Sequence, residues 1–321
     1  MIRYIIRRLL WVLVTLLLVA LITYTIFFVM PSTDPAVNFA GKQPTPEIVA
    51  RVRVLFGLDK PFVVQYGQFV GRLFLGDDYG WPGLGFSFST RSELKPVILD
   101  RLWVTAQLAI GAAILWLMIG IPIGILSALK PRSIFDRLAM GFALFGVSAP
   151  VFFIGPVLLY VFWYKLQLLP GTGYYPIEDG LSQWYLHMLL PWCVLALGFA
   201  AFYARMSRAN LIETMSEDYI RTARAKGLSE RRVVLKHGVR ASLTPIVTML
   251  GLDLGALLGG AIITETVFNL PGIGQYAVQS VFSGDFYAIL DITLIAAFFI
   301  TIANLIVDIV YAFLDPRVRY T

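Results

Sequence analysis

Residues 216–245 read SEDYIRTARAKGLSERRVVLKHGVRASLTP. This segment is polar and strongly basic, yet long apolar runs precede and follow it. The 321-residue chain as a whole is 58% hydrophobic and only 14% charged, whereas about a quarter of the residues of a soluble domain are charged. The contrast predicts a membrane protein in which this basic segment lies outside the bilayer.

Six apolar runs are each about as long as the roughly 20 helical residues that cross a bilayer. Strands of a membrane barrel would instead show about 10 residues of alternating pattern, so we expect helices. Prolines inside the second, third and fourth runs leave two interpretations open, kinked helices around a pathway or ordinary packing in a bundle. The predicted fold is an all-α membrane protein with six transmembrane helices, at Leu9–Met30, Leu102–Leu129, Leu138–Tyr164, Leu186–Tyr203, Ile246–Val267 and Tyr287–Leu314.

The positions of Lys and Arg predict the orientation of these helices. Seventeen of the 26 basic residues lie at the two termini, between the second and third runs, or in the 206–245 loop together with Arg205 at its edge. The loops at 166–185 and 268–286, on the opposite side, carry none. Basic residues accumulate on the cytoplasmic side, so both termini and the 206–245 loop are expected there. The net charge of +6 is thus a signal of topology and does not indicate a nucleic-acid partner.

Residues 1–30 are interpreted as an uncleaved signal-anchor helix, because the apolar run is long and has no small-residue cleavage site. Residues 31–100 then form an extracytoplasmic subdomain. It is expected to contain one short helix from Pro46 to about Gly57, a second helix at Phe62–Leu75, and an irregular stretch at 77–90. Its role is open between contact with an external partner and a structural lid.

Carboxylates in or beside the last two apolar runs are candidates for lining a pathway or for structural pairing, because a charge inside a bilayer is costly. They are Asp253, Glu265 and Asp291, while Asp308 lies close enough to the inner end to reach the interface. The fifth run also carries Gly251, Gly255 and Gly259 at intervals of four, a stripe that permits close packing of helices. After it, 271–274 predicts a sharp turn and 275–282 a short re-entrant helix.

The basic segment itself predicts two helices joined by a glycine turn. The first runs from about Met215 to Lys226 and ends at Gly227, which suits the left-handed position after a helix. Ser229 can cap the second, which extends to about Arg240. Such an element can dock in an acidic groove of a soluble partner or lie on anionic membrane lipid. The sequence alone favours neither.

The segment RTARAKG, with the LSERRVVLKHGVRASLTP that follows, resembles the cytoplasmic coupling loop of ABC-transporter permeases of the oligopeptide/dipeptide type. Further similarity to that subfamily lies at Tyr4–Leu10, Phe56–Pro61, Thr264–Phe268 and 271–274. Aligned on the glycine, only one of the three residues at the Glu-Ala-Ala positions of the general motif matches. The resemblance implies contact with an ATPase by Tyr219, Arg221, Thr222, Ala223, Arg224, Ala225, Lys226 and Gly227.

The resemblance further implies that residues 101–315 form the five-helix core of a type I importer in the bacterial inner membrane. The expected partners are two cytosolic ATPases that bind ATP and Mg, an external substrate-binding protein, and a second permease, usually a different chain. Peptides are the implied cargo. Motifs for a phosphate-binding loop, a zinc protease or a serine hydrolase are missing, so a non-catalytic subunit without a metal is expected. The alternatives are a proton-coupled transporter that uses the carboxylates and an intramembrane protease with paired aspartates.

Overall fold

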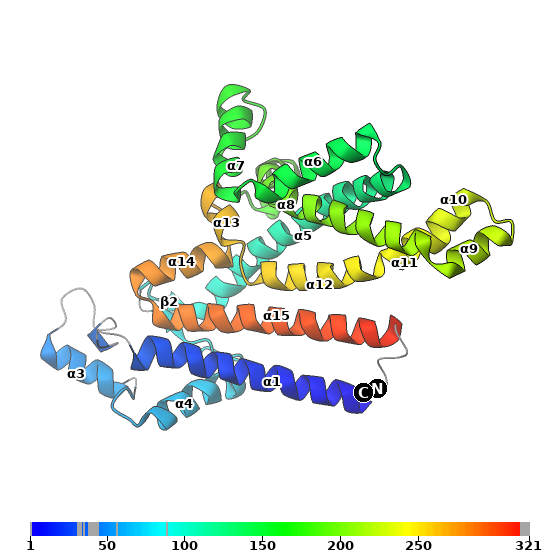
Figure 1. The fold of residues 1–321 in the computed structure, drawn as a ribbon. Coiled ribbons are helices and arrows are strands. Elements are labelled where there is room, and N and C mark those ends of the chain that lie inside the picture. The colour runs from blue at the N-terminus through cyan, green and yellow to red at the C-terminus, as the bar shows by residue number, and fades with distance from the viewer. Residues whose placement is uncertain are drawn as a thin grey trace. The chain divides into compact units, whose positions relative to one another are not determined.

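The computed structural model of the protein describes residues 2–30, 34, 36–37, 45–55, 57–87 and 89–314. The chain forms two compact units. Unit 1 comprises Met1–Thr105, Leu258–Ile262 and Gly272–Thr321, and unit 2 comprises Ala106–Leu257 and Ile263–Pro271. Figure 1 labels the helices and strands of both.

Unit 1 contains a long helix near each end of the chain. A small subdomain follows the first of these helices in the sequence. The elements of unit 1 are α1 (Ile2–Tyr24), the π-helix η1 (Thr25–Val29), α3 (Pro46–Leu55), α4 (Phe62–Leu75), β1 (Phe86–Ser87), β2 (Ser92–Glu93), the start of α5 (Leu94–Leu129), α14 (Ile273–Ser283) and α15 (Phe286–Leu314).

Unit 2 takes the rest of α5 and the helices that follow it. These are α6 (Ile134–Ser148), α7 (Val151–Leu158), the π-helix η2 (Leu159–Lys165), the 3-10 turn η3 (Ile177–Asp179), α8 (Leu181–Ser216), α9 (Asp218–Ala225), α10 (Glu230–Arg232), the π-helix η4 (Val233–Val239), α11 (Arg240–Ser242), α12 (Thr244–Leu258) and α13 (Ile262–Phe268).

Five helical stretches among the described residues are long and apolar enough to cross a membrane, and a sharply bent pair makes a sixth. The five are Ile6–Val29, Leu94–Leu129, Leu181–Ser216, Glu230–Leu258 and Phe286–Ile309. The bent pair joins Ile134–Ser148 to Val151–Lys165 and falls on the third predicted run. The prediction of an all-α fold with six transmembrane segments is therefore confirmed.

The third segment bends by 103° at the junction of α6 and α7. Ala149 precedes Pro150 there, and a proline ring disfavours the helical conformation of the residue before it. Ala149 is accordingly extended, with ψ of 120°. Pro122 and Pro191, in contrast, lie inside the continuous helices α5 and α8. A proline thus breaks one of these segments and leaves two others uninterrupted.

The fifth segment is not the single helix predicted at Ile246–Val267. α12 ends at Leu258, and α13 begins only at Ile262. Gly260 between them has φ of +122°, in a region of backbone conformation open mainly to glycine. A Cβ atom on this residue would also lie only 2.7 Å from the Cα of Gly274. The break therefore requires a glycine for both conformation and space.

Aromatic side chains join α4 to α1 and η1 in unit 1. The ring of Tyr24 stacks on Phe28 with centroids 4.6 Å apart and lies 5.4 Å from the ring of Phe69. The Tyr66 hydroxyl donates to the backbone oxygen of Leu17 at 2.8 Å. Offset and tilted ring contacts of this kind stabilise a core beyond the area that they bury. The short helix α4 is thereby fixed against the first transmembrane helix.

Most of the local predictions for residues 31–100 are confirmed. α3 begins at Pro46, and α4 has the predicted bounds. The stretch at 77–90 is not wholly irregular, because β1 pairs with β2 as an antiparallel hairpin. Asp77 orders the turn before this hairpin by accepting hydrogen bonds from the backbone N–H groups of Tyr79 and Gly85 at 2.9 and 2.8 Å.

α1 and α15 lie side by side in unit 1, as Figure 1 shows. Near their ends, the guanidinium of Arg8 pairs with the carboxylate of Asp308 at 2.8 Å. The predicted position of Asp308 near the end of its helix is consistent with this contact, which supplies the carboxylate with a partner.

A bidentate ion pair joins α6 to α8 in unit 2. Arg208 donates from Nε and from a terminal nitrogen to the two oxygens of Asp136, at 2.6 and 2.8 Å. Asp136 also accepts from the backbone N–H of Arg132 at 2.8 Å and is only 4% exposed. Planar, charge-assisted pairs of this geometry are among the stronger polar contacts in proteins.

We predict that Arg208→Ala lowers the free energy of unfolding by roughly 2–4 kcal/mol, because Asp136 is left buried without its charged partner. Arg208→Lys should recover only part of this loss, since an ammonium cannot make the bidentate contact. Thermal unfolding of the full chain in detergent measures both changes. Arg205→Ala, three residues away, is the matched control, and equal effects of Arg205→Ala and Arg208→Ala would contradict the prediction.

Candidate functional site

The 206–245 loop continues directly from a membrane-spanning helix. α8 runs without a break for 36 residues and ends at Ser216, far beyond the predicted end at Tyr203. Glu217 is then extended, with ψ of 148°, and α9 begins at Asp218. The predicted helix start at Met215 is therefore wrong, because α8 continues past it. Glu217 occupies the N-cap position of α9 but makes no side-chain capping bond there.

α9 is amphipathic and buries one narrow face within the loop. Ile220 and Ala223 are buried and pack against Val233 of η4, with Met215 and Leu228 at the edge of the cluster. Ala223 therefore belongs to the interior of the loop. Its predicted contact with an ATPase stays a prediction. The exposed residues of the predicted contact set are Tyr219, Arg221, Thr222, Arg224, Ala225, Lys226 and Gly227.

Most of the positive charge of α9 faces solvent. Arg224 donates to both carboxylate oxygens of Glu230, at 2.7 and 3.1 Å, and so holds α9 to the start of α10. That hydrogen bond raises the pKa of the Arg224 guanidinium, which therefore stays charged. Arg221 makes only a long contact of 3.3 Å with Asp218, and its side chain is 74% exposed. Arg221 is thus available to a partner.

The turn after α9 has the glycine that the sequence predicts. Gly227 adopts φ of +75°, a left-handed conformation that favours glycine. No atom lies within 4 Å of where its Cβ would stand, so conformation alone sets this requirement. Ser229 then occupies the N-cap position of α10, as predicted, but without a side-chain capping bond.

Close packing joins the returning chain to α8. A Cβ atom on Gly238 of η4 would lie 2.7 Å from the sulfur of Met215 and 3.2 Å from Leu211, so glycine permits the approach. The side-chain amide of Asn210 also donates to the backbone oxygen of Ser242 at 3.4 Å. The chain from η4 to α11 thus packs against α8, while Val233 at the start of η4 packs against α9.

The three candidate carboxylates lie in different surroundings. Asp253 is half-buried and accepts a hydrogen bond of 2.6 Å from the fully buried hydroxyl group of Tyr203 on α8. Glu265 in α13 is fully buried, so its carboxylate is closed to solvent. Asp291 in α15 is also fully buried. Of the three, Asp253 is the most accessible.

Asp291 forms a buried ion pair that the sequence does not predict. A terminal nitrogen of Arg72 on α4 lies 3.8 Å from its carboxylate. The guanidinium also lies 5.0 Å from the centre of the Tyr287 ring. Gly85 leaves room for it, because a Cβ there would come within 2.5 Å of the guanidinium. Arg72 is the only charged residue of α4 and could have drawn attention, but its partner is more than 200 positions away in the sequence.

The glycine stripe is shorter than predicted. Gly255 is buried and Gly251 partly buried on α12, whereas Gly259 lies beyond the end of that helix. The predicted role of these glycines in helix packing stays a prediction.

Among the described residues, no group of three or more His, Cys, Asp and Glu side chains is arranged to hold a metal ion. His237 lies instead in a basic hollow with Lys236 and Arg240.

Comparison with known proteins identifies the family. Residues 120–320 match the family described as binding-protein-dependent transport system inner membrane component. Residues 1–109 match the N-terminal region of such membrane components. The two matches together cover nearly the whole chain.

Individual relatives agree with these matches. A Brucella abortus protein named as a peptide transport system permease is 37% identical over 316 residues, 98% of each chain. The glutathione transport system permease protein of Salmonella typhimurium is 38% identical over 320 residues and the full length of both.

A solved structure of the MetNI methionine ABC transporter, in inward facing conformations, has the same fold. Its TM-score is 0.56 at 18% identity, over 69% of this chain and 97% of the other. The fold is that of an ABC importer permease. The chain belongs to the family of binding-protein-dependent transport system inner membrane components.

Proposed function

We propose that this chain forms half of the translocation pathway of an ATP-driven peptide importer and takes up the motion of cytosolic ATPases through α9. The observation that carries the proposal is the construction of α9. Ile220 and Ala223 on its apolar face are buried inside the loop, while its basic side is exposed. A short rigid helix with exposed cations fits an acidic groove on a soluble partner.

Peptide cargo is inferred from the relatives. Proteins named as peptide and glutathione permeases resemble the chain over almost its entire length, and glutathione is itself a small peptide. On this proposal the chain is non-catalytic, and the ATPase subunits bind ATP and Mg. A second permease, a different chain, supplies the other half of the pathway, and both termini are cytoplasmic.

The external binding protein would dock on the side of the bilayer opposite α9. Residues 31–100 and 268–286 are the proposed contact regions, because the predicted topology places both on that side of the membrane. The contacts of α4 with α1 support a rigid platform there.

Asp253 is the residue at which the alternative function, a proton-coupled transporter, can be tested. Its half-buried carboxylate has one hydrogen-bond donor, the hydroxyl of Tyr203, within unit 2. In an ATP-driven importer this pair is structural or lines the pathway. In a proton-coupled transporter the carboxylate would have to bind and release a proton in every cycle.

We predict that the double variant Arg221→Glu/Lys226→Glu abolishes ATP-dependent uptake. The amount of ATPase that co-purifies with the chain should fall by roughly tenfold or more, which corresponds to about 1.4 kcal/mol of binding free energy. Both side chains are exposed, so the thermal unfolding temperature should not change.

Lys130→Glu is the matched control for that experiment, because Lys130 is an exposed cation between the second and third transmembrane segments. It should leave ATPase binding near the wild-type level. Retention of the ATPases by the α9 double variant would refute docking at α9.

We predict that uptake into vesicles depends on ATP and survives a protonophore. Asp253→Asn should reduce it by roughly fivefold at most, because an amide oxygen still accepts the Tyr203 hydrogen bond at a loss of about 1 kcal/mol. Tyr203→Phe should have a similarly small effect. The proton-coupled alternative instead requires that Asp253→Asn stop uptake and that the protonophore do so too.

A further inference from the structure

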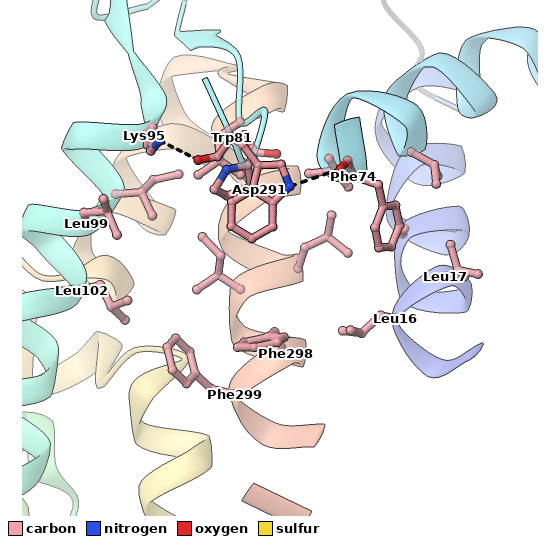
Figure 2. Close-up of a pocket in the computed structure, with 18 of the residues that line it drawn as sticks. Leu16, Leu17, Phe74, Trp81, Lys95, Leu99, Leu102, Asp291, Phe298 and Phe299 are labelled. Carbon is pink, nitrogen blue, oxygen red and sulfur yellow. Dashed lines mark hydrogen bonds between the residues drawn. The ribbon is translucent and has the colours of Figure 1, made fainter. Parts of the chain in front are cut away.

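An apolar crevice of about 440 Å³ lies within unit 1, between α1, α4, the start of α5 and α15. Figure 2 shows Leu16 and Leu17 of α1 on one side and Leu99 and Leu102 of α5 on the other, with Phe298 of α15 between them. α1, α5 and α15 are all transmembrane candidates. The crevice therefore lies at the depth of the bilayer, in the half that adjoins residues 31–100.

The wall of the crevice suits a hydrocarbon chain. Lys95 and Asp291 carry the only charges among the side chains that line it, and nearly all the others are aliphatic or aromatic. Asp291 is fully buried beside Arg72, so its charge is already balanced. Water in an apolar space of this kind would lack the two to four polar partners that it needs. Lipid, in contrast, is the solvent around these helices.

The polar end of the crevice is built from Lys95 and Trp81. The Lys95 ammonium donates to the backbone oxygen of Trp81 at 2.6 Å, and the Trp81 indole donates to the backbone oxygen of Phe74 at 3.1 Å. Figure 2 shows both bonds. An ammonium has three donors, so two remain. No carboxylate of the described residues forms an ion pair with Lys95.

Tryptophan and lysine are the residues that mark a membrane interface, because each joins an apolar body to a polar tip. Trp81 is 68% exposed above the crevice. The crevice therefore has a cation at the level of the headgroups and an apolar cleft beneath it. This order of polarity matches a phospholipid, with its phosphate near the ammonium and an acyl chain in the cleft.

We propose that the crevice is a binding site for one anionic phospholipid, whose acyl chain lies between α1, α5 and α15 and whose phosphate contacts Lys95. The lipid would fill the space beside α4 and Trp81, and so support the subdomain at residues 31–100. The crevice is lined by residues of unit 1, whereas α9 belongs to unit 2, and the proposal does not depend on the identity of the cargo.

Photolabelling of the full-length chain, purified in the assembly that it forms in its own membrane, tests the proposal. The assembly is reconstituted into vesicles of phosphatidylethanolamine. These vesicles also contain a trace of phosphatidylglycerol that carries a photoreactive diazirine in one acyl chain. We expect adducts concentrated on the peptides that contain Leu16, Leu99 and Phe298. Leu99→Trp, which fills the cleft, should lower this labelling by roughly fivefold or more.

Two controls make the result specific. Leu126→Trp adds the same bulk to an exposed position of α5 that does not line the crevice, and should leave labelling unchanged. Lys95→Gln should weaken labelling by the phosphatidylglycerol probe but not by a diacylglycerol probe that lacks the phosphate. The thermal unfolding temperature of each variant shows whether it is folded.

Three results would overturn the proposal. One is labelling spread evenly along α1 and α15. Another is an equal response to Leu99→Trp and Leu126→Trp. The third is labelling of the isolated chain that disappears in the assembled transporter, which would mean that another protein covers the crevice.

Discussion

The need to pair every backbone N–H and C=O group inside a bilayer governs this structure. The hydrocarbon of lipid offers no hydrogen bonds, so a helical segment that crosses it must stay helical wherever it meets hydrocarbon. The two interruptions of the membrane segments fall where the backbone leaves no other choice, at Ala149 before a proline and at Gly260 with φ of +122°. Ala149 lies in unit 2 and Gly260 in the Leu258–Ile262 stretch of unit 1, whereas α1 and α15 continue unbroken beside each other.

Burying a charged side chain is also costly, and several carboxylates of this structure are paired with an arginine. Asp136 has Arg208, Asp291 has Arg72, and Asp308 has Arg8. Each pair joins two helices that are distant in the sequence, so the cost of burial also specifies which helices meet. Asp253 differs, because its partner is the neutral hydroxyl of Tyr203 and its carboxylate stays partly accessible.

Local patterns predicted the helices well and their contacts poorly. The bounds of α4, the glycine turn at Gly227 and the six apolar segments follow from hydrophobic length and residue conformation, which neighbouring residues determine. The burial of Ala223 and the pairing of Asp291 with Arg72 depend on which surfaces meet in three dimensions. The end of α8 was misplaced because polar residues end an apolar run without ending a helix.

The length of α8 has a geometric consequence. A helix of 36 residues is about 54 Å long, whereas the hydrocarbon core of a bilayer is about 30 Å thick. α8 is therefore longer than the hydrocarbon core is thick, and α9 follows the end of α8 that projects beyond the lipid. Each residue of a helix turns the chain by about 100°, so the number of residues in α8 sets the direction in which α9 faces. A single residue inserted into α8 or deleted from it would therefore turn α9 by about 100° about the axis of α8.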